Sequence, residues 1–361
     1  MCNLAEVISG FSVNLKILMV LIDEFDYELP KELIAQEPLE ERENSRMLVV
    51  NRKENSYKDD FFYNFPDYVG GTDVLVLNNT KVFPARLIGY KADTKARIEV
   101  FLIRKISDLT WEVLARPARR LKKDTKVVFD EDFSATVLER CEDGHFILRF
   151  ECERNFYEEL ERIGKTPLPP YIKRDASFHD KQRYQTVYAK KTGSIAAPTA
   201  GLHFTEKILQ RIREKGTQIV EITLHVGYGT FEPVKVKELS AHSVLPEEGE
   251  IDAETAAMLN QSKQSGKRII AVGTTTTRLL EFFATEEGRI GSGKKMVDLT
   301  IIPGYKFKFV DALLTNFHLP KSSLLVMVST FTGYELIMNA YRHAISARYR
   351  FYSYGDCMLI L

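Results

Sequence analysis

Three histidines lie beside glycine or proline, at points where apolar runs of the sequence end. They are His203 in APTAGLHF, His225 in TLHVGYGTF and His318 in LLTNFHLP. A histidine titrates near neutral pH and is therefore suited to general acid–base catalysis. One such histidine is more often a structural hydrogen-bonding group. Three of them at the ends of predicted elements favour a shared pocket, because α/β proteins gather their sites at strand ends.

Two further stretches would shape that pocket. Pro198 fixes φ and Gly201 permits a positive φ, so the residues between them predict a shaped turn with His203 at its exit. In IIAVGTTTTRLLE, an apolar strand turns at Gly273 into threonines that begin a helix, so hydroxyls and free N–H groups can face a polar ligand. A threonine N-cap alone is the simpler interpretation of this second stretch.

A basic run, RPARRLKK at residues 116–123, is a candidate nucleic-acid surface. Five of its eight side chains are Arg or Lys. Over the 361 residues, 50 Lys and Arg balance 50 Asp and Glu, so binding to a phosphate backbone would depend on local patches of this kind. A run of cations is also the ordinary composition of a solvated face, and composition does not separate the two interpretations.

Other signatures are absent from the sequence. The chain has no G-x-G-x-x-G loop opening a βα unit, no Walker sequence, no G-x-S-x-G elbow and no H-E-x-x-H. Its four cysteines lie far apart without a C-x-x-C pair, which argues against a zinc cluster or a disulfide framework and fits a reducing cytoplasm. Polar residues interrupt the first 25 residues and no small-residue cleavage site follows, so we expect neither a signal peptide nor a membrane-spanning helix.

The spacing of apolar runs predicts two kinds of structure. Between residues 73 and 150, runs such as DVLVL, RIEVFLIR and HFILRF follow one another with turn-forming residues between many of them, which is typical of a small barrel or sandwich. After residue 151 helical and strand patterns alternate, and RMLVVNR near the start also has a strand pattern. We therefore predict an α/β fold whose α/β domain is split by an inserted small antiparallel β-barrel. The predicted parts are a disordered N-terminal extension at 1–18, an α/β catalytic domain at 19–72 and 152–361, and the barrel at 73–151.

Long blocks of the chain resemble one protein family, in order, from about Asp23 to Leu361. They include VLNNTKVFPARL, PLPPYIKR, RYQTVYAKKTGSIAAPTAGLHFT, VGTTTTRLLE and PGYKFKFVDALLTNFHLPKSSLLVMVSTF. The family is the S-adenosylmethionine:tRNA ribosyltransferase-isomerases of the queuosine pathway. The resemblance implies an α/β domain with an inserted β-barrel. It also implies that the ribosyl group of S-adenosylmethionine is transferred and isomerised onto 7-aminomethyl-7-deazaguanine at the tRNA wobble position, giving epoxyqueuosine-tRNA, adenine and methionine.

The resemblance further implies a cytoplasmic bacterial enzyme that acts as a monomer. S-adenosylmethionine would be its co-substrate and tRNA its partner, with no permanently bound cofactor, no metal and no membrane. Such a reaction breaks a glycosidic bond and expels methionine from a sulfonium centre, and both steps involve proton transfers that a histidine can carry. His203 is the first catalytic candidate, with His225 and His318 behind it.

Binding roles follow from the same resemblance. Arg278 would pair with the methionine carboxylate, and Asp311 or Asp356 would orient a histidine or contact the ribose hydroxyls or the methionine ammonium. The candidate substrate-binding residues are Thr199, Gly201, Gly227, Thr274, Thr275, Arg278, Asp311, Asn316 and Asp356. The candidate tRNA-binding residues are Arg116, Arg119, Arg120, Lys122, Lys173 and Arg174.

The chain departs from the family pattern in three blocks. The usual HVGLGTFRPV carries Tyr228 and Glu232 here, so a positive charge is lost beside the glycine turn. The block H-x-M-H-x-E corresponds to LSAHSVLPEEGE, in which His242 matches the second histidine. The acid of that block is one of three residues, Glu247, Glu248 or Glu250. TTSVR has become TTTTR, which keeps the arginine and adds hydroxyls.

Two other classes of protein are alternatives. A non-catalytic RNA-binding protein would fit the basic run, but it leaves the histidine-bearing turns unexplained. Another S-adenosylmethionine-dependent RNA-modifying enzyme, such as a methyltransferase, would carry a Gly-rich loop after its first strand and an acidic residue at the end of the next, and neither is found. The reaction products would separate the three classes.

Overall fold

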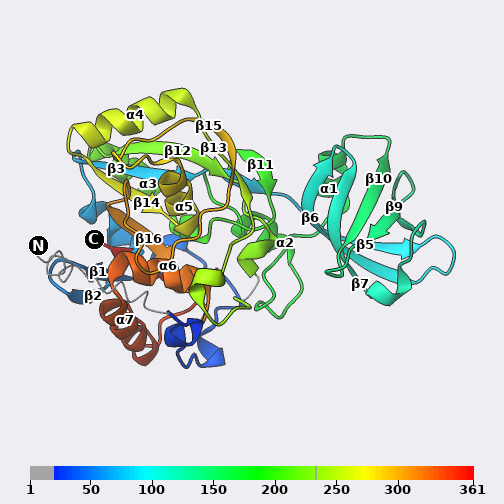
Figure 1. The fold of residues 1–361 in the computed structure, drawn as a ribbon, viewed down its shortest axis with the longest axis horizontal. Coiled ribbons are helices and arrows are strands. Elements are labelled where there is room, and N and C mark those ends of the chain that lie inside the picture. The colour runs from blue at the N-terminus through cyan, green and yellow to red at the C-terminus, as the bar shows by residue number, and fades with distance from the viewer. Residues whose placement is uncertain (1–19, 232–233) are drawn as a thin grey trace, which may run out of the picture.

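The structure is a computed structural model that describes residues 20–231 and 234–361. It has a large α/β unit and a separate β-barrel, which lie at opposite ends of the long axis in Figure 1. The extension predicted at residues 1–18 lies outside the described residues. No helix within the described ranges is long and apolar enough to cross a membrane.

The α/β unit is built on a nine-stranded sheet in the order β15-β13-β12-β3-β14-β16-β17-β1-β2. Its strands are β1 (Arg46–Asn51), β2 (Ser56–Phe61), β3 (Asp73–Asn78), β12 (Gln218–Leu224), β13 (Glu247–Ile251), β14 (Arg268–Val272), β15 (Gly293–Val297), β16 (Ala312–Asn316) and β17 (Cys357–Ile360). The four central strands β12, β3, β14 and β16 are parallel, so their carboxyl ends meet at one edge. β17 is antiparallel to β16 and parallel to β1, so the amino ends of β17 and β1 lie at that same edge.

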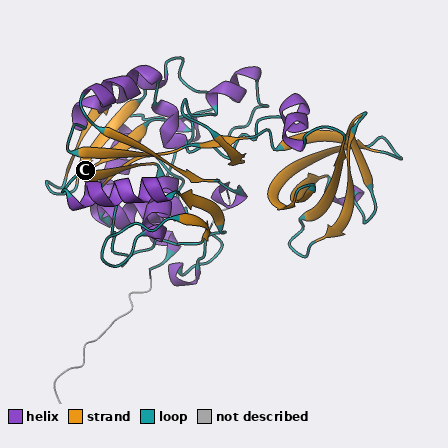
Figure 2. Ribbon diagram, turned by 90° about the horizontal axis from the view of Figure 1, so that it is seen from above, coloured by secondary structure: helices purple, strands orange, loops and turns teal. Residues whose placement is uncertain are grey.

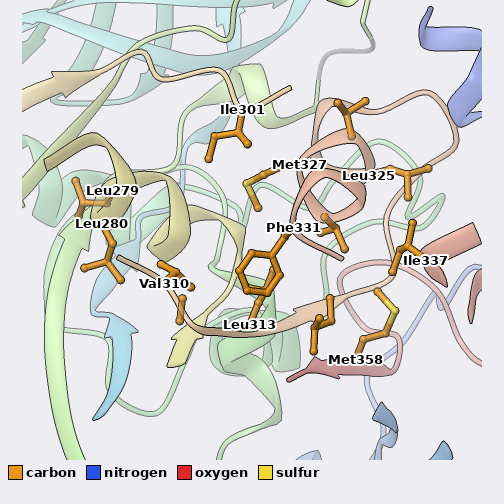
Figure 3. Close-up of a cluster of buried hydrophobic side chains, with 14 of the residues drawn as sticks. Leu279, Leu280, Ile301, Val310, Leu313, Leu325, Met327, Phe331, Ile337 and Met358 are labelled. Carbon is orange, nitrogen blue, oxygen red and sulfur yellow. The ribbon is translucent and has the colours of Figure 1, made fainter. Parts of the chain in front are cut away.

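Helices cover both faces of this sheet, as Figure 2 shows. One face packs against η4 (Phe62–Tyr68) and α3 (Glu206–Glu214), and the other against α4 (Ala253–Gln264), α5 (Thr274–Phe283), α6 (Ser323–Thr332) and α7 (Tyr334–Ser346). Figure 3 shows residues of the second face, where Leu280, Phe331 and Ile337 from the helices surround Leu313 and Met358 of the sheet. Because both faces are covered, every residue of the central strands β3 and β16 is buried, and most of these residues are apolar.

The barrel consists of six antiparallel strands that close in the order β10-β7-β6-β5-β8-β9. They are β5 (Arg86–Lys91), β6 (Arg97–Ser107), β7 (Thr110–Arg116), β8 (Lys126–Asp130), β9 (Phe133–Arg140) and β10 (Phe146–Cys152). Alternate residues such as Leu87, Val100 and Val113 point inward and are fully buried. Helix α1 (Phe156–Ile163) packs Phe156 on Trp111, with ring centroids 5.5 Å apart.

These observations confirm the predicted fold class, an α/β fold with a small closed antiparallel barrel. The predicted boundary of the barrel at residue 73 does not match the sheet pairing, however. β3, whose sequence DVLVLN was assigned to the barrel, pairs with β12 and β14 in the middle of the large sheet. All six of its residues are buried, as expected of a central parallel strand covered on both faces. After β3 the chain forms β4 (Thr80–Val82), which pairs with β11 (Lys191–Ser194) before the barrel begins.

Candidate active site

A pocket opens at the sheet edge where β14 and β16 end. Its walls are the turn η6 (Thr199–His203), the start of α5, the residues that follow β16 and the loop that precedes β17. The cavity measures about 730 Å³ when the open solvent at its mouth is included. The polar and aromatic residues that line it are Tyr171, Tyr184, Thr199, Thr274, Thr275, Thr315, Asn316, Phe317, His318, Ser322, Tyr352 and Ser353.

Five of the sequence-predicted site residues line this pocket. Three short motifs supply them, although the motifs are far apart in the chain. The five are Thr199, Thr274, Thr275, Asn316 and His318. The other candidates, His203, His225, Gly201, Gly227, Arg278, Asp311 and Asp356, do not line the pocket. The motifs meet because each one follows or faces the same edge of the sheet.

The turn between β14 and α5 leaves the start of the helix open. Gly273 has φ of +93°, a conformation that favours glycine, and it provides no side chain to cap α5. The first intrahelical bond runs from the Thr277 N–H to the Gly273 carbonyl, 3.1 Å long. The hydroxyls of Thr276 and Thr277 bond to carbonyls one turn back, whereas Thr274 and Thr275 line the pocket. The pocket therefore faces an uncapped helix N-terminus, which favours an anionic group.

His203 is buried beneath the pocket. The ring Nδ1 lies 2.8 Å from Ser45 Oγ and Nε2 lies 3.2 Å from Asn316 Nδ2. The Asn316 Nδ2 also lies close to two backbone carbonyls and therefore acts as a donor, so His203 Nε2 accepts and Nδ1 carries the proton. Burial, followed by the nearby cations Arg42 and Arg350, lowers the pKa of His203 to about 3. The ring is neutral at pH 7 and fully engaged, which suits a positioning role.

Asn316, at the end of β16, has its amide turned by these contacts. Nδ2 donates to the carbonyls of Tyr352 and Asp356, at 3.1 and 3.2 Å. The side chain is only 2% exposed, and Oδ1 has no hydrogen-bond partner in the described part of the protein. The hydroxyl of Tyr352, in the same pocket, is likewise buried and unpaired there. The pocket therefore contains polar atoms whose hydrogen-bonding capacity is unused.

His318 is the one histidine among the three candidates that lines the pocket. Its Nε2 lies 2.9 Å from Thr315 Oγ1, and burial lowers its pKa to about 3. The hydroxyl of Tyr27 donates to its carbonyl, and its own N–H donates to the hydroxyl of Tyr341 at 2.9 Å. The backbone of His318 is thus held on both sides, and the ring is neutral at pH 7.

His225 lies outside the pocket, beside β4 and β11. Its Nδ1 lies 2.8 Å from Thr80 Oγ1, and Thr80 Oγ1 also donates to Ser194 Oγ at 2.9 Å. Burial lowers the pKa of His225. A Cβ at Gly193 would lie 2.6 Å from the His225 ring, so glycine is required there by the close approach of the two segments.

Gly201 also owes its place to close packing. Its φ is not positive, so this turn does not use the left-handed conformation that glycine permits. A Cβ at this position would lie 2.1 Å from the Tyr188 hydroxyl and 2.7 Å from Thr186 Cγ2. The turn η6 is therefore shaped by what packs against it rather than by a left-handed residue.

Arg278 is committed to the protein's own groups. Nη1 lies 2.7 Å from Glu247 Oε2, and Nε and Nη2 donate to the carbonyls of Leu299 and Val297. Glu247 also accepts a bond of 2.8 Å from the N–H of Gly227. Of the three acids that sequence comparison left open, Glu247 is the buried one, and its inward place in the alternating strand EEGEI is the signal that could have identified it. The expectation that Arg278 meets a substrate carboxylate has no support in this geometry.

Neither candidate aspartate lines the pocket. Asp311 precedes β16 and therefore lies at the opposite edge of the sheet, about 16 Å along the strand from Asn316. Its carboxylate accepts from Lys263 Nζ at 2.7 Å and from the N–H of Ile269 at 2.8 Å. Asp356 is buried, which raises its pKa, and its carboxylate accepts from the backbone N–H groups of Arg46 and Arg350. Both carboxylates serve the fold in these contacts.

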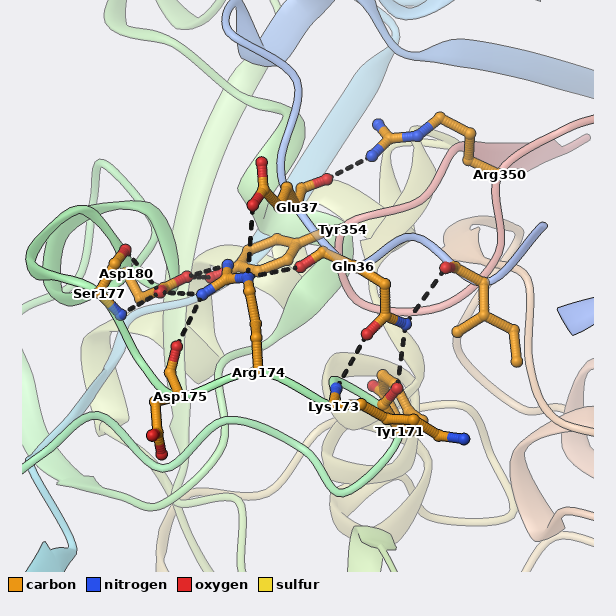
Figure 4. Close-up of polar contacts among 11 residues, drawn as sticks. Gln36, Glu37, Tyr171, Lys173, Arg174, Asp175, Ser177, Asp180, Arg350 and Tyr354 are labelled. Atoms are coloured by element: carbon orange, nitrogen blue, oxygen red, sulfur yellow. Dashed lines mark hydrogen bonds and ion pairs between the residues drawn. The ribbon is translucent and has the colours of Figure 1, made fainter. Parts of the chain in front are cut away.

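The candidate tRNA-binding cations fall into two groups. Arg116, Arg119, Arg120 and Lys122 are exposed around η5 (Ala118–Arg120) on the barrel, and no ion pair to them is found in residues 20–231 and 234–361. Lys173 is also exposed. Arg174 differs, because it forms a bidentate pair with Asp180 at 2.6 and 2.9 Å and donates to the Gln36 carbonyl, as Figure 4 shows. Its guanidinium is used within the protein.

One cluster of potential metal ligands occurs in the described ranges, on the barrel. Ligand atoms of Glu112, Asp143 and His145 all lie within 4.8 Å of one another. Glu112 also pairs with Arg104 at 2.7 Å, so a cation already balances this carboxylate. The cluster shares no residue with the pocket.

Comparisons with known proteins agree with this architecture. A profile of the queuosine biosynthesis protein family matches residues 22–360. S-adenosylmethionine:tRNA ribosyltransferase-isomerases from Thermoanaerobacter sp. and Halothermothrix orenii are 50% and 48% identical to this chain over 339 and 341 residues, which cover 94% of this chain and 99% of each relative. A crystal structure of S-adenosylmethionine tRNA ribosyltransferase from Thermotoga maritima is 38% identical, covers 94% of this chain and 100% of its own, and has a TM-score of 0.54. The chain therefore belongs to the queuosine biosynthesis protein family.

Proposed function

We propose that this protein is an S-adenosylmethionine:tRNA ribosyltransferase-isomerase. It transfers the ribosyl group of S-adenosylmethionine to 7-aminomethyl-7-deazaguanine at the tRNA wobble position and isomerises it, releasing adenine and methionine. The observation that carries the proposal is the similarity of about 50% identity over almost the whole chain to proteins of that name. The pocket supports it, since the motifs that resemble the family supply its walls.

The pocket offers suitable chemistry for a nucleoside with an amino-acid tail. Aromatic faces of Tyr171, Tyr184 and Tyr352 can pack against a flat base, and the start of α5 can bind an anion. His318 is the candidate histidine in position to touch a bound substrate. Its low pKa keeps the ring neutral, so it can exchange a hydrogen bond with the substrate.

The exposed cations around η5 form the proposed tRNA surface, with Lys173 as a further contact. Each cation that neutralises a phosphate releases a counterion, which makes binding depend on salt. We also propose that the enzyme acts as a monomer. Light scattering of the purified protein tests this part of the proposal.

Product analysis tests the proposed reaction. The protein is incubated with S-adenosylmethionine and with tRNA that carries 7-aminomethyl-7-deazaguanine, and the small molecules are separated by chromatography. We expect adenine and methionine in equal amounts, and a tRNA whose mass increases by the transferred ribosyl group. Release of S-adenosylhomocysteine would identify a methyltransferase instead, and tRNA binding without turnover would identify a non-catalytic RNA-binding protein. The matched control is tRNA with unmodified guanine at the wobble position.

A further inference from the structure

We propose that the pocket binds the α-amino-acid end of S-adenosylmethionine, with the carboxylate at the N-terminus of α5 and the ammonium on Asn316 Oδ1. This inference rests on the proposed function and assigns one part of the substrate to one part of the site. It replaces Arg278, which sequence comparison favoured as the carboxylate ligand.

The first observation is the open N-terminus of α5. The helix has ten residues, Gly273 gives it no side-chain cap, and the N–H groups of Thr274, Thr275 and Thr276 precede its first intrahelical bond. Thr275 Oγ1 accepts a bond of 3.3 Å from Asn78 Nδ2, which leaves its hydroxyl proton available as a donor. Backbone and hydroxyl donors together with the helix dipole suit a carboxylate.

The second observation is independent of the helix and concerns an acceptor. Asn316 lines the same pocket, is 98% buried and has no partner for Oδ1 within the described residues. Three contacts fix the opposite side of its amide, on the carbonyls of Tyr352 and Asp356 and on the ring of His203. A buried unpaired acceptor is costly to leave empty, and a cationic N–H donor is the group that satisfies it best.

The two positions lie at the ends of neighbouring strands. β14 and β16 are adjacent parallel strands, and the N–H of Gly273 donates to the Leu314 carbonyl at 2.8 Å. Asn316 is the last residue of β16 and Thr275 is the third residue after β14, and the two strands lie about 4.8 Å apart. In an α-amino acid the nitrogen and the carboxylate carbon are about 2.5 Å apart, so one such group reaches both positions through ordinary hydrogen bonds.

The charge of the pocket agrees with this occupant. No Asp, Glu, Lys or Arg is among the described residues that line it. A zwitterion with a carboxylate and an ammonium brings no net charge, so neutral donors and acceptors suffice to bind it. Arg278 is unavailable, because its guanidinium is held by Glu247 and by two carbonyls. His203 acts through Asn316 and is a positioning residue.

Binding measurements that combine variants with ligand analogues test the assignment. Dissociation constants are measured by calorimetry without tRNA for three ligands, which are S-adenosylmethionine, its decarboxylated analogue and its deaminated analogue. We expect Thr275→Val to weaken S-adenosylmethionine about tenfold and the decarboxylated analogue hardly at all. We expect Asn316→Ala to weaken S-adenosylmethionine by a similar factor and the deaminated analogue hardly at all. His203→Gln should reproduce the Asn316 pattern, because a misplaced amide affects only ligands with the amine.

Thr276→Val is the matched control for Thr275→Val. It makes the same substitution on the next residue of α5, where the hydroxyl bonds to the Val272 carbonyl, and it should leave all three dissociation constants at their wild-type values. Equal losses for all three ligands in Thr275→Val and Asn316→Ala would overturn the inference. If Asn316→Ala does not fold, the Thr275→Val comparison alone decides.

Two outcomes separate this inference from the proposed function. In the first, the wild-type protein binds S-adenosylmethionine and releases adenine and methionine, but the variants weaken all three ligands equally. This outcome refutes the subsite alone. Wild-type protein that does not bind S-adenosylmethionine refutes both. A carboxylate-specific loss in Arg278→Lys, without one in Thr275→Val, would place the carboxylate at Arg278.

Discussion

Acidification should destabilise the protein through two buried histidines. Burial lowers the pKa of both His203 and His318 to about 3, from an ordinary value of 6.5. Below pH 6.5 the unfolded chain takes up protons at these rings that the folded chain does not bind. The unfolded state then binds more protons, so the free energy of unfolding decreases as the pH falls, and the full stabilisation is present only above pH 6.5.

The size of the effect follows from the difference between the pH of the measurement and 6.5, the ordinary pKa of histidine. Each ring contributes about 1.4 kcal/mol per pH unit below 6.5, so a change to pH 5.0 costs about 2 kcal/mol for each ring and about 4 kcal/mol for the pair. Burial also lowers the pKa of His225 and of His242, which adds to the loss with the same sign. At pH 5.0 an ordinary Asp is about 93% ionised and an ordinary Glu about 83%, so carboxylates add a pH dependence of their own, which the comparison of each histidine variant with the wild type cancels. A loss of this size is a large part of a typical stability of 5–15 kcal/mol.

Urea unfolding at pH 7.5 and pH 5.0, followed by far-UV circular dichroism, measures the difference. The fluorescence of Trp111 reports on the barrel and serves only as a second probe, because it is the one tryptophan of the chain. In His203→Asn and in His318→Asn, the difference in unfolding free energy between pH 7.5 and pH 5.0 should shrink by about 2 kcal/mol. This holds even if each variant is less stable at both pH values. His179→Asn, which changes an exposed histidine, is the control and should keep the full difference. The reasoning fails if His203→Asn retains the wild-type pH dependence.

Three other substitutions have expected outcomes. Replacing Arg119 and Arg120 with alanine should weaken tRNA affinity and flatten its dependence on salt, while titration shows unchanged S-adenosylmethionine binding. Gly201→Ala should cost about 1–3 kcal/mol in urea unfolding, because the new Cβ would lie 2.1 Å from the Tyr188 hydroxyl. Glu247→Gln should cost about 3–5 kcal/mol by the same measurement, since it leaves a buried guanidinium without its anion, and a loss below 1 kcal/mol would contradict that account.

The fold could be predicted from the sequence where the local pattern is unambiguous. Alternating runs in β6 and β10 indicated a small antiparallel barrel, since one side of each strand must be apolar and the other polar. The assignment failed for β3, because a short fully apolar run fits a barrel strand as well as a central parallel strand. Only its pairing with β12 and β14, more than 130 residues away, distinguishes the two.

The pocket could be predicted as a collection of motifs, but the roles within it could not. The threonines after Gly273 and the pair Asn316 and His318 lie together because strand ends share an edge, which is a property of the fold class. Whether a histidine faces a cavity or fills a core depends on neighbours that are remote in the chain. His203 contacts Ser45, 158 positions earlier, and no local signal marks that pair.

Arg278 illustrates the same limit with a charge. An arginine one turn into a helix beside a glycine turn is a reasonable anion ligand on sequence grounds. Its partner Glu247 lies on β13, where the alternation of EEGEI groups Glu247 with the apolar Ile251 but does not identify Arg278 as its partner. The ion pair becomes evident only when β13 is placed beside β12 and α5, which determines the side of the strand that faces inward.

The attachment of the barrel explains why His225 lies apart from the pocket. β4 precedes the barrel and β11 follows it, and the two strands pair with each other. Thr80 Oγ1, on β4, lies within hydrogen-bond distance of the His225 ring. Ser194 Oγ, on β11, accepts a hydrogen bond from the N–H of Val226, just before the glycine turn. That turn reaches the barrel through the ring of Tyr228, whose centroid is 5.8 Å from that of Phe101. It also reaches α5, because the N–H of Gly227 and the guanidinium of Arg278 bond to the same carboxylate, that of Glu247. The glycine turn therefore links the helix whose start lines the pocket to the barrel that carries the exposed cations through one continuous set of contacts.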